Sequence, residues 1–430
     1  MAKPTVAGEK QGAMKRLVAW VDERYPMTEA WEAHVSKYYA PKNFNFWYYF
    51  GSLALVVLVL QFLTGIFLTM HYKPDTGLAF ASVEYIMRDV DWGWLIRYMH
   101  STGASLFFVV IYLHMFRAFL YGSHREPREL LWIVGVAIFV ALMAEAFLGY
   151  LLPWGNMSYW GAQVIISLFD AIPLVGPALA EWIRGDFVVS DATLNRFFAL
   201  HVIAVPLVLV LLVFIHIVAL HKVGSNNPDG IEIKKNKDAN GIPLDGIPFH
   251  PYYTVKDLVG TTVFLMLFAV IMFFAPELWG WFLEHDNFVP ANILQTPVDI
   301  KPLWYFTPFY SILRANTINF FWIDAKIWGV LSMGLSIMVF FLVPWLDRSP
   351  VKSVRYRGPM YKTALAIFVV SFILLGYLGT RKPDDVDLFL LKNVYWAQLG
   401  TIAYFAFFFL MPIYTKLDKT KSVPERVRWK

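Results

Sequence analysis

Long apolar stretches alternate with shorter polar connections along most of the chain. Eight apolar segments lie near residues 44–70, 94–121, 129–152, 192–221, 258–283, 327–346, 361–379 and 394–414. Most of them exceed the roughly 18 residues that a helix needs to cross a hydrocarbon layer of about 30 Å, and most are bounded by Trp, Tyr, Arg or Lys. The pattern predicts an all-α integral membrane protein with eight transmembrane helices.

The connections between these segments divide the chain into parts. The loops at about 153–191 and 284–326 contain apolar stretches, and a segment such as Trp160–Ile172 is typical of a helix on the membrane surface. The polar loop that starts at Lys222 separates two groups of four spans. We therefore predict a cytoplasmic N-terminal extension (1–43), an N-terminal four-helix bundle (44–221), a cytoplasmic connecting loop (222–257), a C-terminal four-helix half (258–415) and a cytoplasmic tail (416–430).

Composition agrees with a membrane protein and suggests its orientation. Of the 430 residues, 58% are hydrophobic and only 16% are charged. An even number of spans places both termini on one side, and most of the 37 Lys and Arg residues then fall on that side. The positive-inside rule predicts that this side is the cytoplasm, so the net charge of +5 reflects loop asymmetry and not nucleic-acid binding. Because the chain has no cysteine, it has no thiolate ligand for a metal or an iron–sulfur cluster.

Four of the ten histidines lie inside apolar spans, where polar groups are costly and usually functional. His100 and His114 are 14 residues apart in the second span, which places them on one helix face about 21 Å apart. His201 and His216 occupy the fourth span with a spacing of 15, and Pro206 lies between them. A proline can locally widen a helix and absorb the extra residue. Two facing helices of this kind offer two stacked imidazole pairs, as two haem irons require.

Glycines repeat the same spacing in the two neighbouring spans. Gly51 and Gly65 lie in the first span and Gly135 and Gly149 in the third, each pair 14 residues apart. Glycine lets a flat macrocycle approach a backbone closely, although it also marks ordinary helix packing. Antiparallel threading matches Gly65 and Gly149 to an outer pair of ligands, His100 and His201, and matches Gly51 and Gly135 to an inner pair, His114 and His216. Arg97 and Arg117 each lie three residues from a histidine and suit haem propionates, or anchor the helix at the interface.

The chain resembles the cytochrome b family of bacterial bc1 complexes from Pro41 to about Leu417. The resemblance rests on the runs PKNFNFW, LQFLTGIFL, LAFASVEYIMRDV, YLHMFR, EPRELLWIVG, GYLLPWGNMSYWGA, TLNRFFALH and PLWYFTPFYSILRA. It implies a fold in which the N-terminal bundle holds two non-covalent b-type haems. It also implies an outer site for quinol oxidation, made by Phe147, Tyr150, Gly161, Ile165, Pro302, Tyr305 and Tyr310, and an inner site for quinone reduction, made by His221, Ser225, Lys256 and Asp257.

One position departs from the family pattern. The family commonly has glutamate as the second residue of a Pro-Glu-Trp-Tyr motif, where it is thought to accept a quinol proton, and this chain has Leu303. Leucine cannot bind a proton. Glu145, one turn before Gly149 in the third span, is a candidate replacement, and Asp299 is the alternative.

The resemblance implies the membrane subunit of a quinol–cytochrome c oxidoreductase in the bacterial inner membrane. Ubiquinol would be oxidised outside and ubiquinone reduced inside, with a Rieske iron–sulfur protein and a cytochrome c1-type subunit as partners and a homodimeric complex. Two other interpretations fit the membrane histidines. One is a simpler di-haem anchor that carries electrons from a dehydrogenase to quinone, and the other is a proton-coupled transporter without haem.

Overall fold

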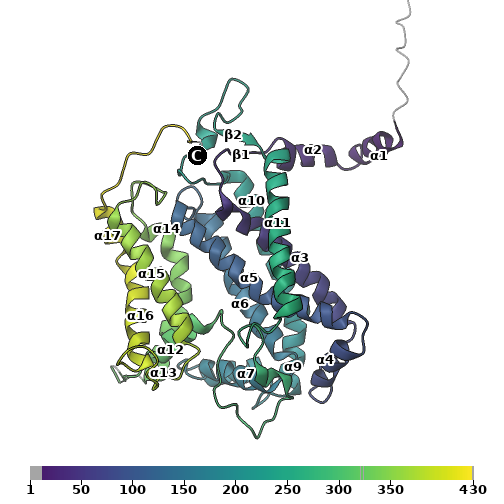
Figure 1. The fold of residues 1–430 in the computed structure, drawn as a ribbon, viewed down its shortest axis with the longest axis vertical. Coiled ribbons are helices and arrows are strands. Elements are labelled where there is room, and N and C mark those ends of the chain that lie inside the picture. Colours follow the sequence, from purple (N-terminus) through teal and green to yellow (C-terminus); the bar gives the residue numbers. More distant parts are fainter. Residues whose placement is uncertain (1–11, 320, 323, 429–430) are drawn as a thin grey trace, which may run out of the picture.

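A computed structural model describes residues 12–319, 321–322 and 324–428, and its elements are nearly all helices (Figure 1). Residues 1–11 of the expected N-terminal extension and 429–430 of the tail lie outside this range. The two short strands that are described, β1 (Tyr39–Pro41) and β2 (Gly246–Pro248), pair antiparallel. They join the segment before the first long helix to the loop that connects the two halves.

The long apolar helices confirm the predicted membrane architecture. Within the described residues, seven continuous helices are long and apolar enough to cross a membrane, and a bent pair makes an eighth. The spans are formed by α3 (Tyr49–Thr69), α5 (Gly93–Tyr121), α6 (Glu129–Leu151), α9 (Asp191–Ala199) continuing into α10 (Val205–Val223), α11 (Phe249–Phe274), α13 (Ala325–Met338) continuing into α14 (Val343–Leu346), α15 (Pro359–Leu378), and α16 (Asn393–Phe409) with α17 (Met411–Leu417).

Two spans differ from the sequence prediction, and proline explains where the fifth span ends and where the eighth bends. The fifth was expected to run to residue 283, but α11 ends at Phe274. Ala275 has φ −153° and ψ 57°, because the residue before a proline, here Pro276, avoids the α conformation. The eighth span bends by 60° between α16 and α17, where Pro412 follows the break at Leu410. Because α11 also begins at Phe249, before the predicted start, it has the predicted length of 26 residues but lies nearer the N-terminus than apolar composition indicated.

Shorter helices lie at the two ends of the bundle. At one end, α4 (Ala79–Arg88) lies in the connection between α3 and α5, and the long loops contain α7 (Asn156–Phe169), α8 (Gly176–Arg184) and α12 (Thr307–Arg314). Figure 1 shows α7 lying across the ends of the long helices, as expected for a helix on the membrane surface. At the other end are α1 (Ala13–Asp22) and α2 (Met27–Trp31), together with the C-terminal end of the described chain. The two described ends thus lie on one side, as an even number of spans requires.

A buried polar cluster, the inner polar seam, joins the two halves at the end that carries the termini. Arg128 Nη1 and Nη2 donate to the two carboxylate oxygens of Glu232 at 2.6 and 2.9 Å, and Lys352 pairs with the same carboxylate. Nearby, the Asp347 carboxylate accepts hydrogen bonds from Arg357, and His124 Nε2 lies 2.9 Å from it. Because these groups come from loops of both halves, the seam fixes one half against the other.

Candidate functional site

The four membrane histidines form two facing pairs, one above the other, between α5 and the α9–α10 span. The ring centroids of His100 and His201 are 6.2 Å apart, and those of His114 and His216 are 6.5 Å apart. A metal–imidazole bond of about 2 Å on each side of one metal ion puts the centroids of two opposed rings ~6 Å apart. Each pair therefore has the spacing that a single iron between two imidazoles requires.

The extra residue between His201 and His216 is absorbed next to the outer histidine. Residues Leu200–Ala204 form a π-helical turn, which holds one more residue than an α-helical turn. Pro206 lies two residues beyond this turn and has no N–H to continue the regular pattern of backbone hydrogen bonds. The turn confirms the local widening predicted from the 15-residue spacing, and it brings both histidines to the same side of the span.

Each of the four glycines with the 14-residue spacing lies against one histidine ring. A Cβ atom on Gly51 would lie 3.3 Å from His114 Cε1, and one on Gly65 would lie 3.3 Å from His100 Cε1. The corresponding distances are 3.2 Å from Gly135 to His216 and 2.4 Å from Gly149 to His201. Gly65 and Gly149 thus share the level of the outer pair, and Gly51 and Gly135 share that of the inner pair. The absence of side chains leaves room beside all four rings.

Hydrogen bonds orient the outer histidines by their Nδ1 atoms. His100 Nδ1 lies 2.9 Å from the Thr64 hydroxyl oxygen, and His201 Nδ1 lies 3.0 Å both from the Glu145 backbone oxygen and from its carboxylate Oε1. A hydrogen bond at one ring nitrogen directs the other toward a metal. Sequence reasoning missed Thr64, although its place directly before Gly65 is a signal for it. It placed Glu145 near this level without the contact to His201.

Arg97 and Arg117 lie near the histidine levels without an acidic partner. Among the described residues neither forms an ion pair with Asp or Glu. Arg117 donates to Ser123 Oγ at 3.3 Å, and its guanidinium lies over the Tyr48 ring, while its Nε has no hydrogen-bond partner. A half-buried guanidinium whose buried Nε has no hydrogen-bond partner suits a carboxylate ligand.

The predicted outer residues gather where the end of α6 meets α7 and the loop before α12. Gly161 on α7 faces the Tyr150 ring, since its Cβ would lie 3.7 Å from Tyr150 Cε1. Tyr305 is buried, stacks on Phe108 with centroids 3.9 Å apart, and its carbonyl accepts a hydrogen bond from Tyr112. Leu303 is also buried and packs in the same apolar cluster as Tyr305.

The remaining predicted outer residues lie around this group. Phe147 packs on Phe197, and Ile165 and Pro302 are half-buried. The Tyr310 hydroxyl lies 3.5 Å from the Ile300 carbonyl oxygen. Asp299 is 53% exposed and pairs with Lys382, so the structure does not place it inside the group.

Sequence reasoning missed a buried carboxyl group in this region, that of Glu284. The Tyr150 hydroxyl donates to Glu284 Oε2 at 3.0 Å, and Asn287 Nδ2 donates to the Tyr150 hydroxyl at 2.9 Å and to Glu284 Oε2 at 3.1 Å. Burial raises the pKa of Glu284 to about 7, even though Tyr150, Lys301 and Asn287 favour the charged form. An acidic residue directly after the apolar stretch Trp281–Leu283 is the signal that was available in the sequence.

The predicted inner residues lie near the end that carries the termini. The Tyr38 ring packs on His221 with centroids 4.7 Å apart, and the Tyr38 hydroxyl lies 3.4 Å from Ser225 Oγ. A surface cavity of about 370 Å³ is lined by Tyr38, His221, Lys234 and six other residues. On α11, the Lys256 ammonium lies over the Tyr253 ring, and the Asp257 carboxyl interacts with Ser52, the neighbour of Gly51. Tyr38 was not identified from the sequence, because it lies outside the apolar spans.

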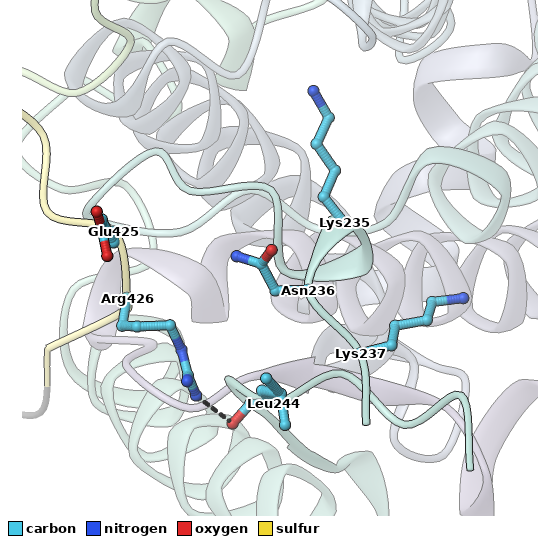
Figure 2. Close-up of a pocket in the computed structure, with 6 residues that line it drawn as sticks. All are labelled: Lys235, Asn236, Lys237, Leu244, Glu425 and Arg426. Atoms are coloured by element: carbon cyan, nitrogen blue, oxygen red, sulfur yellow. Dashed lines mark hydrogen bonds between the residues drawn. The ribbon is translucent and has the colours of Figure 1, made fainter. Parts of the chain in front are cut away.

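A separate cavity of about 590 Å³ lies between the connecting loop and the C-terminal tail (Figure 2). Lys235, Lys237 and Arg426 line it, and the Arg426 guanidinium donates to the Leu244 carbonyl. None of the predicted site residues lines it.

Comparison with known proteins gives a consistent family assignment. Residues 35–224 match the family described as cytochrome b/b6/petB, and residues 290–405 match the family described as cytochrome b(C-terminal)/b6/petD. The chain is 61% identical to the cytochrome b of Allochromatium vinosum over 414 residues, which cover 95% of this chain and 98% of that protein. It is 47% identical to the cytochrome b of Rhodospirillum rubrum over 410 residues, covering 95% of each. A solved structure described as a hyperthermophilic respiratory complex III matches with a TM-score of 0.82 and 38% identity, covering 93% of this chain and 99% of that one.

Proposed function

The chain belongs to the cytochrome b/b6 family, and we propose that it is the di-haem subunit of a complex III that oxidises quinol on one side of the membrane and reduces quinone on the other. The observation that carries this proposal is the two stacked histidine pairs, with centroids 6.2 and 6.5 Å apart. A chain without cysteine cannot hold an iron–sulfur cluster by thiolates, so a Rieske-type partner would supply that acceptor. A cytochrome c1-type partner and a homodimeric complex complete the assembly that we propose.

The chain's own residues would hold the haems as follows. His100 and His201 would ligate the outer haem and His114 and His216 the inner one, each through Nε2. Thr64 and Glu145 orient the outer rings through Nδ1. The four glycines leave space for the macrocycles, and Arg97 and Arg117 would pair with their propionates. When bound, the haems would supply one-electron carriers at two depths of the bilayer.

The quinone sites would lie at opposite ends of the two stacked histidine pairs. Near the outer histidines, the Tyr150, Gly161 and Tyr305 region would bind quinol between α6, α7 and the loop before α12. Near the inner histidines, His221 lies five residues beyond His216 and borders a cavity, where it can donate a hydrogen bond or proton to a quinone oxygen. Ser225, Lys256 and Asp257 would complete that site. We place the inner site on the cytoplasmic face of a bacterial inner membrane, with both termini on that face.

Haem quantitation on the purified complex tests this proposal. We expect two non-covalent b-type haems per chain in a dithionite-reduced spectrum, and loss of haem when any of the four histidines is replaced by leucine. Inhibitors that act selectively on each face would then block two different partial reactions. A single quinone site would favour a di-haem anchor of a dehydrogenase, and a protein without haem would favour a transporter.

A further inference from the structure

The carboxyl group of Glu284 is held in place by segments that are far apart in the sequence. The loop after α11 is fastened to the α6–α7 turn by backbone hydrogen bonds from Asn156 N to the Val289 oxygen and from Ala291 N to the Trp154 oxygen. The Ser158 N–H donates to Asn287 Oδ1 at 2.8 Å, so the amide nitrogen of Asn287 faces Tyr150 and Glu284. The loop that carries Glu284 is therefore fixed to this end of the bundle by hydrogen bonds.

We propose that Glu284 accepts a proton from quinol at the outer site, the task for which Leu303 has no suitable group. This inference rests on the proposed quinol oxidation. It follows from the chain of contacts that begins at Gly161, which faces the Tyr150 ring, and continues from the Tyr150 hydroxyl to Glu284 Oε2 at 3.0 Å. The hydroxyl can pass a proton along this bond, since it donates to Glu284 and can accept from a bound quinol.

The transfer balances as one proton moved through two oxygen atoms. The quinol O–H bond breaks and its proton goes to the Tyr150 oxygen, while the Tyr150 proton goes to Glu284 and forms the carboxylic acid. Oxidation of quinol to quinone releases two protons and two electrons, and this path takes one of the protons. The second proton would leave with the electron that the iron–sulfur partner of the proposed function accepts, and the other electron would pass to the outer haem. Glu284 then releases its proton on the outer side, where the next residue, His285, has a side chain that is 80% exposed.

The surroundings of Glu284 set the pH range in which its carboxylate can accept a proton. Tyr150 on α6, Asn287 in the same loop, and Lys301 and Tyr305 in the loop before α12 all act on its carboxyl group. Burial dominates and raises the pKa of Glu284 to about 7. Because a proton acceptor must first be deprotonated, the rate of quinol oxidation should rise as the pH rises through about 7. Burial together with the Glu284 charge raises the pKa of Tyr305, which stays protonated there.

The test compares Glu284→Gln, Glu284→Asp and Glu277→Gln in the intact complex, with a short-tailed ubiquinol as substrate. Glu277 is the matched control, because it lies in the same loop, is 35% exposed and pairs with His285. We expect Glu284→Gln to lower the kcat for quinol oxidation by about 100-fold and to remove its rise with pH. Glu284→Asp should keep the pH dependence, and Glu277→Gln should match the wild type.

Infrared difference spectra give a readout that a purely structural role would not change. A carboxylic C=O band that titrates near neutral pH in the wild type should be missing in Glu284→Gln, while haem content stays the same. A Glu284→Gln complex with wild-type kcat and pH profile, or with the band still present, overturns the inference. If the wild-type complex itself does not oxidise quinol, the proposed function fails instead.

Discussion

Replacing Gly149 by alanine should selectively weaken the outer haem site. The new Cβ would lie 2.4 Å from His201 Cε1 and 2.9 Å from both ring nitrogens, about 1 Å closer than ordinary van der Waals contact. The imidazole would have to leave its position between Gly149 and His100. Overpacking of this kind costs about 1–3 kcal/mol, which corresponds to roughly a 5- to 150-fold weaker retention of the haem.

The same protein contains the reference for this measurement, because the inner pair lies at a different level. Reduced-minus-oxidised spectra of the purified Gly149→Ala complex should show the outer haem depleted and the inner haem at full occupancy. Gly51→Ala is the matched control, since its Cβ would lie 3.3 Å from His114 Cε1 and needs a shift of only a few tenths of an ångström. Full occupancy of both haems in Gly149→Ala, or depletion of the inner one, would refute the reasoning.

Three further outcomes follow from the structure. Glu145→Gln should shift the reduction potential of the outer haem, because the Glu145 carboxylate lies 3.0 Å from His201 Nδ1. If the variant also lost the pH dependence of quinol oxidation, Glu145 would be the proton acceptor. An unchanged pH profile would exclude Glu145 from that role. Arg357→Leu removes the nearer of two cations from buried Asp347 and leaves Arg125 Nε at 4.0 Å. It should destabilise the protein by about 3–5 kcal/mol, measured as a lower thermal unfolding midpoint. Burial opposes the charge of Asp347, but Arg357 and His124 hold its pKa well below the usual range, so the wild-type stabilisation should be present above about pH 4 and be lost as the pH falls further. Deleting Ile203 from the π-helical turn should leave both haems bound, whereas deleting Leu211 from regular helix should rotate His216 by about 100° and cost the inner haem, as haem quantitation would show.

Helical periodicity made the histidine ladder predictable, and distance along the chain hid the contacts of Glu284. The levels of His100, His114 and the four glycines follow from spacing and antiparallel threading alone, and the structure places each glycine at the level expected for it. Tyr150 and Glu284 are 134 residues apart, so their hydrogen bond depends on how the loop after α11 folds back. Neither hydropathy nor helical spacing carries that information.

The end of a helix could be predicted only where the sequence becomes polar at the residue where the helical backbone stops. Mostly apolar residues, interrupted by Glu277, continue past Phe274 to Leu283, so composition extended the fifth span beyond the point where Pro276 ends it. The π-helical turn at Leu200–Ala204 was expected because two observations, the 15-residue spacing and Pro206, agreed.

The inner polar seam has a consequence for the covalent continuity of the chain. Its ion pairs join residues 124–128 and 232 to residues 347–357, and none of them uses the exposed hairpin tip at Asn240 and Gly241. The tip only links the two halves covalently, whereas the ion pairs of the seam hold the folded halves against each other. A polypeptide cut at this tip would keep every seam contact, so two separately translated fragments have what they need to reassemble in the bilayer.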